Sequence, residues 1–307
     1  MKNQKPWVGH LSALITILIW ASTFISTKLL LEVFSPIEIM VFRFIFAWLA
    51  LFIASPKILK IKSLKEEGLF AAAGLCGVTL YFLLQNTALS LTLASNVSVL
   101  ISVAPLFTAL LSWIFLKDKS LSLFFVLGFA AAIIGIALIS FNGQFNLNLN
   151  PIGDLLAILS ALAWAIYSLL IKKISALPYS LIQSTRKIFF YGLLLVLPFL
   201  GLFNFRLDLS RFSSLPVFLN LVFLGVGASA FCFVSWNFAV NILGAVRTSK
   251  YIYLSPIFSV FISVIVLKEK ITWIAVLGVA MILVGLFLSE QKTILKVSDS
   301  NTSIKSN

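Results

Sequence analysis

Long apolar segments alternate with short polar ones along almost the whole chain. Each apolar run is about 18 to 24 residues long, and roughly 20 helical residues cross a hydrocarbon core of about 30 Å. The strands of a membrane barrel would show alternating apolar residues, whereas the run from Leu121 to Phe141 is continuously apolar. The pattern therefore predicts an all-α integral membrane protein with ten transmembrane helices, at approximately 9–31, 36–55, 68–89, 93–116, 121–141, 152–171, 180–203, 215–238, 246–267 and 271–289.

Composition agrees with a chain that is surrounded mainly by lipid. Of its 307 residues 61% are apolar and 11% are charged, whereas a soluble domain carries about 25% charged residues. The first apolar run is too long for the core of a signal peptide and has no A-x-A cleavage pattern, so we expect it in the mature protein. Cys76 and Cys232 lie in separate predicted spans, which favours small core residues over metal ligands, and no cofactor is expected.

The distribution of Lys and Arg in short connections predicts the orientation in the cytoplasmic membrane, because basic loops stay on the cytoplasmic side. With a cytoplasmic N-terminus, the outer segments contain only Arg206, Arg211, Lys268 and Lys270. We therefore predict that both termini are cytoplasmic. The inner segments would then hold most of the 23 basic residues, namely Lys2, Lys5, Lys57, Lys60, Lys62, Lys65, Lys117, Lys119, Lys172, Lys173, Arg247, Lys250, Lys292, Lys296 and Lys305.

The net charge of +13 does not indicate a nucleic-acid-binding protein. The basic residues are spread over loops next to the predicted spans and form no basic face with interleaved aromatic residues. Anionic lipid headgroups attract such juxtamembrane cations. We therefore expect the lipid bilayer and a small-molecule substrate as partners, and no nucleic acid.

An internal repeat relates the two halves of the chain. Gly9 to Thr23 reads GHLSALITILIWAST, and Gly153 to Tyr167, 144 positions later, reads GDLLAILSALAWAIY. From Asn86 and Asn237 onward the offset is about 151, and one loop insertion in the second copy explains the change. The predicted units are repeats at 9–141 and 152–289, followed by a cytoplasmic tail at 290–307.

Each predicted repeat contains five spans, so the second copy enters the membrane from the opposite side. Two halves with inverted topology can exchange conformations and open one central site alternately to the two sides of a membrane. The repeat therefore predicts alternating access by a secondary transporter.

A further set of motifs runs over nearly the whole chain: WASTFISTK at 20–28, Pro36, Arg43, Ala94-Ser95 through Pro105 to Leu116, RTSKYIYLSPIFSVFISVIVLKEKIT at 247–272, Gly278 and Gly285. Together these motifs resemble the EamA-type permeases of the drug/metabolite transporter superfamily. The resemblance implies ten helices in two five-helix repeats, a cavity lined mainly by helices 1, 3, 4, 6, 8 and 9, and transport or export of metabolites such as amino acids. Asp118 and Lys250 differ from the usual family pattern, where Glu and a small or neutral residue are commoner.

Polar residues inside lipid are costly and therefore tend to face the protein interior. Aromatic walls with a few amides suit a small amphipathic organic molecule. For about half of the candidates, the alternative is an interhelical hydrogen bond or a place in an interfacial aromatic belt. The candidate cavity residues are Trp20, Thr23, Tyr81, Gln85, Asn86, Asn96, Trp164, Tyr167, Trp236, Asn237, Lys250 and Tyr253.

Basic residues within the predicted spans have two interpretations. Lys250 lies one turn into its span, where its ammonium either binds a substrate carboxylate or extends to the cytoplasmic surface. Arg43 and Arg186 are repeat mates at deeper positions, and for them we favour a structural role, with Glu38 as a neighbour of Arg43.

Paired prolines and glycines also recur in the two halves. Pro105 and Pro256 lie near the middle of spans 4 and 9, where each removes one helical hydrogen bond. We predict hinges that border the substrate site, with a static kink as the alternative. The four glycines of spans 5 and 10 recur seven residues apart and predict close helix packing; they are Gly128, Gly135, Gly278 and Gly285.

The sequence contains no HExxH, G-x-S-x-G or phosphate-binding motif and no paired buried carboxylates, so no enzyme is predicted. Export of amino acids or related metabolites is the leading prediction. Exchange of phosphorylated metabolites or nucleotide sugars is an alternative that requires a dense cluster of cavity Lys and Arg. A non-transporting membrane interaction protein is the other alternative. Proton antiport, exchange and facilitated diffusion all remain open, as does the oligomeric state.

Overall fold

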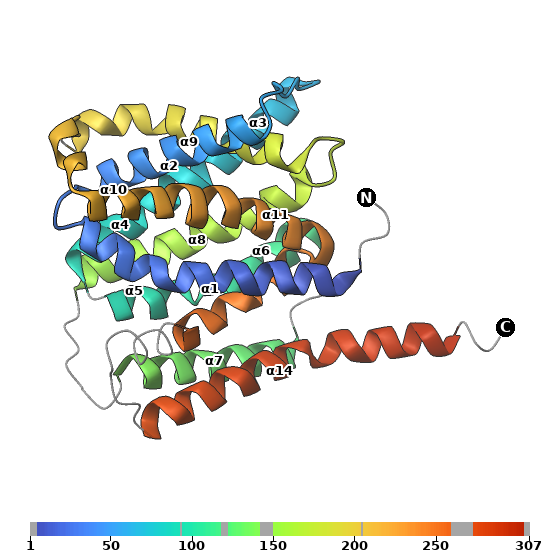
Figure 1. Cartoon of the computed structure of the whole chain (residues 1–307). Coiled ribbons are helices and arrows are strands. Elements are labelled where there is room, and N and C mark those ends of the chain that lie inside the picture. The colour runs from blue at the N-terminus through green and yellow to red at the C-terminus, as the bar shows by residue number, and fades with distance from the viewer. Residues whose placement is uncertain are drawn as a thin grey trace.

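A computed structural model describes residues 5–92, 94–117, 122–141, 150–203, 205–258 and 273–303 (Figure 1). These residues form helices and connecting segments, and they contain no strand. The helices are α1 Pro6–Leu30, α2 Pro36–Ala54, α3 Leu64–Gly74, η1 Leu75–Leu80, α4 Tyr81–Leu91, α5 Ala94–Ile101, α6 Ala104–Leu116, α7 Leu123–Phe141, α8 Pro151–Ile174, α9 Leu181–Leu202, η2 Leu209–Ser213, α10 Leu215–Val222, η3 Phe223–Phe231, α11 Cys232–Leu243, α12 Ala245–Ser249, η4 Lys250–Leu254 and α14 Trp273–Ser303.

Six helical segments of the described chain are long and apolar enough to cross a bilayer. Three of them lie in the first half of the chain and three in the second. Four are single helices, and the other two each combine several consecutive helical elements. Shorter apolar helices accompany them. Large apolar side chains such as Ile53 and Phe115 are exposed on the outside, as expected for contact with lipid. The prediction of an all-α membrane protein is confirmed at this level, while the ten spans and their inverted orientation remain predictions. The six segments are Pro6–Leu30, Pro36–Ala54, Leu64–Leu91, Pro151–Ile174, Leu181–Leu202 and Leu215–Leu243.

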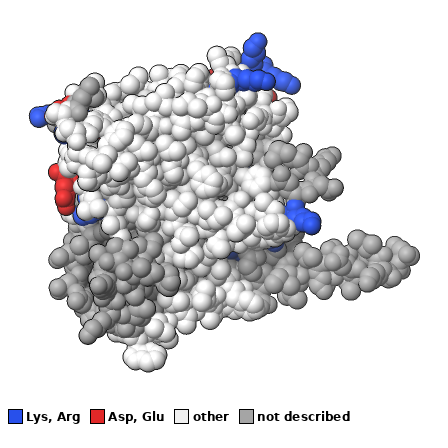
Figure 2. Space-filling view, in the orientation of Figure 1, with Lys and Arg blue, Asp and Glu red and all other residues white. Residues whose placement is uncertain are grey.

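Charged residues lie mainly at the two ends of the bundle. Figure 2 shows a broad face without charged side chains, with Lys, Arg, Asp and Glu toward the left and right of the view. In the same orientation, the start of α1 and the end of α14 lie at the same end (Figure 1). The helix axes run between these ends, so the apolar face is where lipid would cover the protein.

Local sequence signals explain where the helices begin. Ser35 precedes α2 and forms a capping box with Glu38: the Ser35 backbone N–H donates to Glu38 Oε2 over 2.8 Å, and the Glu38 N–H donates back to Ser35 Oγ. Pro36 then occupies the first helical position, where its missing N–H costs nothing. Asn150 and Pro151 start α8 in a similar way, since Asn150 Oδ1 accepts the N–H of Gly153 over 3.0 Å.

Two predicted spans contain a widened, π-helical stretch. η1 joins α3 to α4 without a break, and η3 joins α10 to α11. Leu80 and Phe231, which end the two stretches, are 151 positions apart, the offset of the sequence repeat. Such insertions cluster at functional sites because they re-aim the adjacent side chains. Phe82 in α4 and Phe233 in α11, each two residues after one of these stretches, pack together in the central hydrophobic core.

The glycines of spans 5 and 10 bring α7 and α14 into close contact. A Cβ added to Gly135 would lie 2.5 Å from the carbonyl oxygen of Gly278, and one added to Gly285 would lie 2.5 Å from that of Gly128. The small-residue faces predicted from the seven-residue spacing therefore face each other. α14 does not end near residue 289, because its backbone stays helical to Ser303 through most of the predicted tail.

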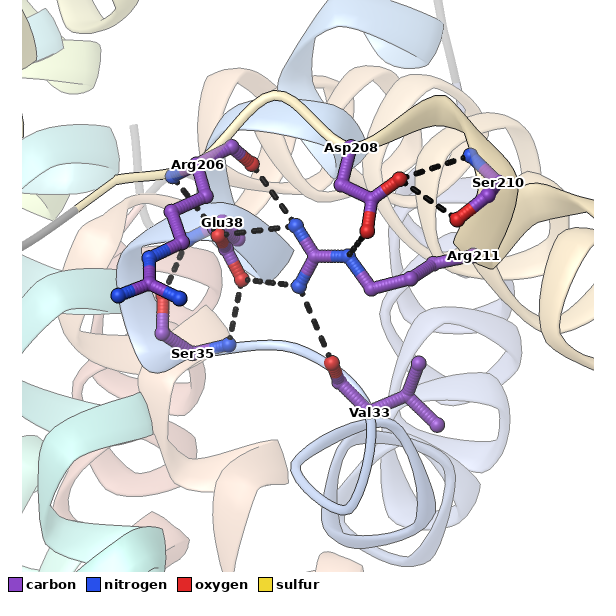
Figure 3. Close-up of polar contacts among 7 residues, drawn as sticks. All are labelled: Val33, Ser35, Glu38, Arg206, Asp208, Ser210 and Arg211. Carbon is purple, nitrogen blue, oxygen red and sulfur yellow. Dashed lines mark hydrogen bonds and ion pairs between the residues drawn. The ribbon is translucent and has the colours of Figure 1, made fainter.

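Glu38 joins the two halves at one end of the bundle (Figure 3). Its buried carboxylate accepts hydrogen bonds from Arg211 Nη1 over 2.9 Å, Arg211 Nη2 over 3.1 Å and the Arg206 N–H over 2.9 Å. Arg211 also donates to the backbone of Val33, and its hydrogen bonds to Glu38 raise its pKa above the ordinary value. Among the described residues, the cation that pairs with Glu38 is therefore Arg211 from the loop after α9 and not Arg43.

The opposite end of the bundle has its own connections between the halves. Arg186 in α9 donates to the backbone carbonyl oxygens of Ser55 and Lys57, after the end of α2. Lys187 forms an ion pair with Glu67 at 2.8 Å. The structural role predicted for Arg186 agrees with these contacts, which hold the α2–α3 connection against the start of α9.

Candidate substrate cavity

A central cavity lies between helices of both halves. It measures about 50 Å³, counted as space open to the centre of a water molecule, and one water needs about 10–15 Å³ on this measure. The cavity therefore admits a few waters or a very small solute, and a metabolite requires the surrounding helices to move. The lining residues are Ile17, Trp20, Thr23, Phe24, Arg43, Tyr81, Phe82, Gln85, Ser98, Ile101, Ser102, Trp164, Phe233, Ile252 and Ser255.

Aromatic rings form a large part of the cavity wall. Trp20 lies edge-on to Trp164 with ring centres 5.2 Å apart, and Tyr81 lies 4.9 Å from Trp164. Phe233 also lines the cavity, and its ring centre lies 5.8 Å from that of Trp20. Edge-to-face and tilted pairs at these separations are favourable and fix the ring planes. The wall is consequently a rigid apolar surface contributed by α1, α4, α8 and α11.

The hydrogen-bonding groups of this wall divide into two sets. Trp20 Nε1 donates to the Ala228 carbonyl oxygen of η3 over 2.8 Å, and Thr23 Oγ1 donates to the Trp20 carbonyl oxygen over 2.8 Å. Gln85 Oε1 and Trp164 Nε1 are buried and have no hydrogen-bond partner among the described residues. Buried polar atoms without partners are costly in a folded protein. These two side chains are therefore suited to bind a polar ligand or water.

Arg43 provides the positive charge of the cavity. Its side chain is 3% exposed, and its guanidinium lies 4.4 Å above the ring of Phe82. Nε donates to Ser229 Oγ over 2.5 Å, and Nη2 donates to the Ala228 carbonyl oxygen over 3.4 Å. Within the described residues no carboxylate forms an ion pair with it. The structure thus places Arg43 in the cavity, although the sequence favoured a structural role.

Several predicted cavity residues hold helices together behind the wall. Asn86 Nδ2 donates to the Pro36 carbonyl oxygen over 3.1 Å. Tyr167 OH donates to Asn237 Oδ1 over 2.8 Å, and Asn237 Nδ2 donates to Thr185 Oγ1 over 3.1 Å. These residues connect α4 to α2 and join α8, α11 and α9. They follow the alternative interpretation of interhelical hydrogen bonds.

Trp236 and Tyr253 lie in two different places. Trp236 is fully buried next to Trp20, with ring centres 5.1 Å apart, and supports the wall from behind. Tyr253 is buried in an apolar cluster with residues of α7 and α14, including Ala132 and Ile282. The side chain of Asn96 lies outside the described residues.

Lys250 does not line the cavity. Its ammonium donates to the carbonyl oxygen of Ser289 in α14 over 2.6 Å and lies 5.6 Å from the ring centre of Phe125 in α7. The side chain is buried, so it does not extend to the cytoplasmic surface either. Neither sequence interpretation of Lys250 describes this contact, which fastens η4 to the α7–α14 pair.

Both halves of the chain match one known protein family. The EamA-like transporter family model matches residues 7–141 and again residues 151–290. The chain belongs to this family. An uncharacterized transporter of Archaeoglobus fulgidus is 28% identical over 293 residues, which cover 92% of this chain and 97% of that protein. The resemblance noted in the sequence is therefore confirmed, and the protein is a transporter of the EamA type.

Two further comparisons concern substrate and fold. A probable terminal-alkyne amino-acid exporter of Streptantibioticus cattleyicolor is 26% identical over 291 residues, covering 94% of this chain and 95% of that protein. A crystal structure at 18% identity matches with a TM-score of 0.72 and covers 92% of this chain and 96% of that chain. The second match shows that the fold of this EamA-like transporter occurs in a solved protein.

Pro105 and Pro256 of the EamA-like transporter each follow an interruption of a helix beside the cavity. α5 ends at Ile101 and α6 begins at Ala104, so the predicted span 4 is broken immediately before Pro105. In the second half, η4 has 3-10 geometry and the α-helix resumes at Ser255, one residue before Pro256. Residues next to each break line the cavity. The hinge role stays a prediction, but both proline sites border the cavity as that prediction requires.

Proposed function

We propose that this EamA-like transporter is a secondary transporter that moves a small metabolite across the cytoplasmic membrane by alternating access. In this proposal ten spans form two inverted five-helix halves, 9–141 and 152–289, with both termini in the cytoplasm. The central cavity carries the proposal, because residues of both halves line it. A helix interruption in each half, before Pro105 and before Pro256, borders the cavity. Bending at these prolines would change access to the cavity.

Export of amino acids or related metabolites fits the cavity best. Its aromatic wall, one guanidinium and one unpartnered amide suit a compact amphipathic molecule. The amino-acid exporter among the relatives supports the same class. An exchanger of phosphorylated metabolites or nucleotide sugars would need several cations, and Arg43 is the one basic residue among the lining residues described.

Flux across liposomes tests this proposal. Purified protein is reconstituted with internal labelled amino acids, with organic acids and phosphorylated sugars as comparison compounds, and efflux is measured. We expect efflux of an apolar amino acid, and a loss of at least about tenfold in Trp164→Ala, equivalent to 1.4 kcal/mol of lost contact. Gly201→Ala serves as the control because nothing lies within 4 Å of its added Cβ.

The result that contradicts the proposal is flux restricted to phosphorylated compounds, or no flux of any compound from protein that remains folded. The first outcome would assign the cavity to another substrate class. The second would favour a membrane interaction protein.

A further inference from the structure

We propose that Arg43 binds the carboxylate of a zwitterionic, apolar amino acid and that Gln85 Oε1 accepts a hydrogen bond from its ammonium group. This inference rests on the proposed function, because it assigns the substrate contacts of the same cavity. It starts from two observations, a buried cation and a buried amide oxygen that line one small cavity.

The charge of Arg43 calls for an anion. A buried guanidinium is costly unless it is paired, and no carboxylate in the described part of the chain forms an ion pair with Arg43. The hydrogen bonds to Ser229 and Ala228 occupy two of its five N–H donors. The planar guanidinium can therefore still present donors to a carboxylate, and Phe82 below it holds the plane in place.

The neutral polar groups define the other end of the ligand. Gln85 Oε1 is an acceptor without a protein donor, and no carboxylate lines the cavity among the described residues. An ammonium group can donate to this oxygen and also gains from the faces of Trp20 and Trp164. Gln85 lies one helical turn after Phe82, so the amide and the guanidinium border the same region of α4.

The lining also defines what the cavity disfavours. A second anionic group, as in a dicarboxylate or a phosphorylated compound, would find no second cation among the described lining residues. A cationic side chain would find no carboxylate there. Aromatic rings surround the remaining space, so an apolar side chain completes the ligand.

Ligand binding can be measured through the tryptophans of the wall. Leucine, methionine and phenylalanine are titrated into the purified protein while tryptophan fluorescence is recorded, to which Trp20 and Trp164 contribute among the seven tryptophans of the chain. Phenylalanine is included because it absorbs outside the tryptophan excitation band. Each amino acid is compared with its carboxamide, which lacks the carboxylate, and with its deaminated acid, which lacks the ammonium. The variants are Arg43→Gln, Arg43→Lys and Gln85→Leu. Arg186→Lys is the matched control, since this repeat mate bonds to backbone carbonyls away from the cavity.

We expect the wild type and Arg186→Lys to bind at least one amino acid at least tenfold more tightly than its carboxamide, the equivalent of 1.4 kcal/mol. Arg43→Gln should remove this preference, and Arg43→Lys should retain part of it. Gln85→Leu should reduce the preference for the amino acid over the deaminated acid.

Several outcomes would overturn the inference. One is a folded Arg43→Gln variant that keeps the wild-type preference for the carboxylate. If that variant does not fold, the wild type and Gln85→Leu decide: a wild type that binds amino acid and carboxamide equally, or a Gln85→Leu variant with unchanged preference, contradicts it. Flux without a preference for the amino acid over its carboxamide would contradict the assignment of Arg43 alone. The same preference without any flux would contradict the proposed transport.

Discussion

Replacing Glu38 with alanine is expected to lower the free energy of unfolding by about 3 kcal/mol, because it leaves the Arg211 guanidinium partly buried without its main counter-ion. The substitution also removes the capping box of α2 and the acceptor for the Arg206 N–H. Thermal unfolding in detergent measures this loss. The first and second halves should separate at this end of the bundle before the rest of the protein unfolds (Figure 3).

Glu32→Ala provides the matched control for Glu38. Glu32 precedes the same α2 start, yet its side chain is exposed. Its removal should leave the unfolding temperature nearly unchanged, as is usual for exposed surface positions. If both substitutions lower the unfolding temperature equally, negative charge in this loop stabilises the fold, and the specific contact between Glu38 and Arg211 does not.

Replacing Gly135 with alanine is expected to cost about 2 kcal/mol through overpacking between α7 and α14. Its Cβ would lie 2.5 Å from the Gly278 carbonyl oxygen, and backbone atoms cannot move aside as a flexible side chain can. The helices would have to separate over the whole contact. Thermal unfolding in detergent, together with helix proximity measured by cross-linking of α7 to α14, checks this expectation.

Gly201→Ala isolates the packing effect from helix propensity. The Gly201 position is helical in α9 and has open space around an added Cβ. Alanine is favoured over glycine within a helix by up to about 1 kcal/mol, so this variant should be as stable as the wild type or slightly more stable. Destabilisation of similar size in both variants would contradict the packing explanation.

The helical membrane fold was predictable because it depends on length and hydropathy. Runs of apolar residues specify helices wherever lipid is the solvent, and proline and capping residues mark several of their ends, as at Ser35 and Pro36. The interruption before Pro105 also follows from local chemistry. The π-helical geometry of η1 and η3 did not follow from the hydrophobic pattern, because the pattern marks apolar positions and not the hydrogen-bond register of the helix.

The candidate site was only partly predictable. Trp20, Thr23, Tyr81, Gln85 and Trp164 line the central cavity, and their contact with a substrate stays a prediction. A polar residue inside a span signals a buried environment, but the signal does not tell a ligand contact from an interhelical hydrogen bond. The sequence did contain a signal for Arg43, because it is a single cation well inside the apolar run of α2. Its environment depends on tertiary contacts that the sequence pattern does not determine.

The sequence pattern did not predict which groups the charged side chains bind. Glu38 and Arg43 are close in sequence, yet Glu38 binds Arg211 from a loop far along the chain. Lys250 likewise binds a carbonyl oxygen of α14. Long side chains reach several neighbours, so spacing within one helix does not fix which partner they take.

Alternating access is the central claim, and cysteine accessibility at Ser98 tests it most directly. Cys76 and Cys232 are first replaced by alanine, and a single cysteine is introduced at Ser98, which lines the cavity. A membrane-impermeant thiol reagent is then applied from either side of the membrane. Cysteines at the exposed positions Lys60 and Ser213 report the predicted cytoplasmic and outer surfaces.

The account predicts that Ser98→Cys reacts from both sides and that a transported amino acid protects it. Lys60→Cys should react only from the cytoplasm and Ser213→Cys only from outside. Reaction of Ser98→Cys from one side alone, or from neither, while both surface cysteines react as predicted, would contradict alternating access through this cavity.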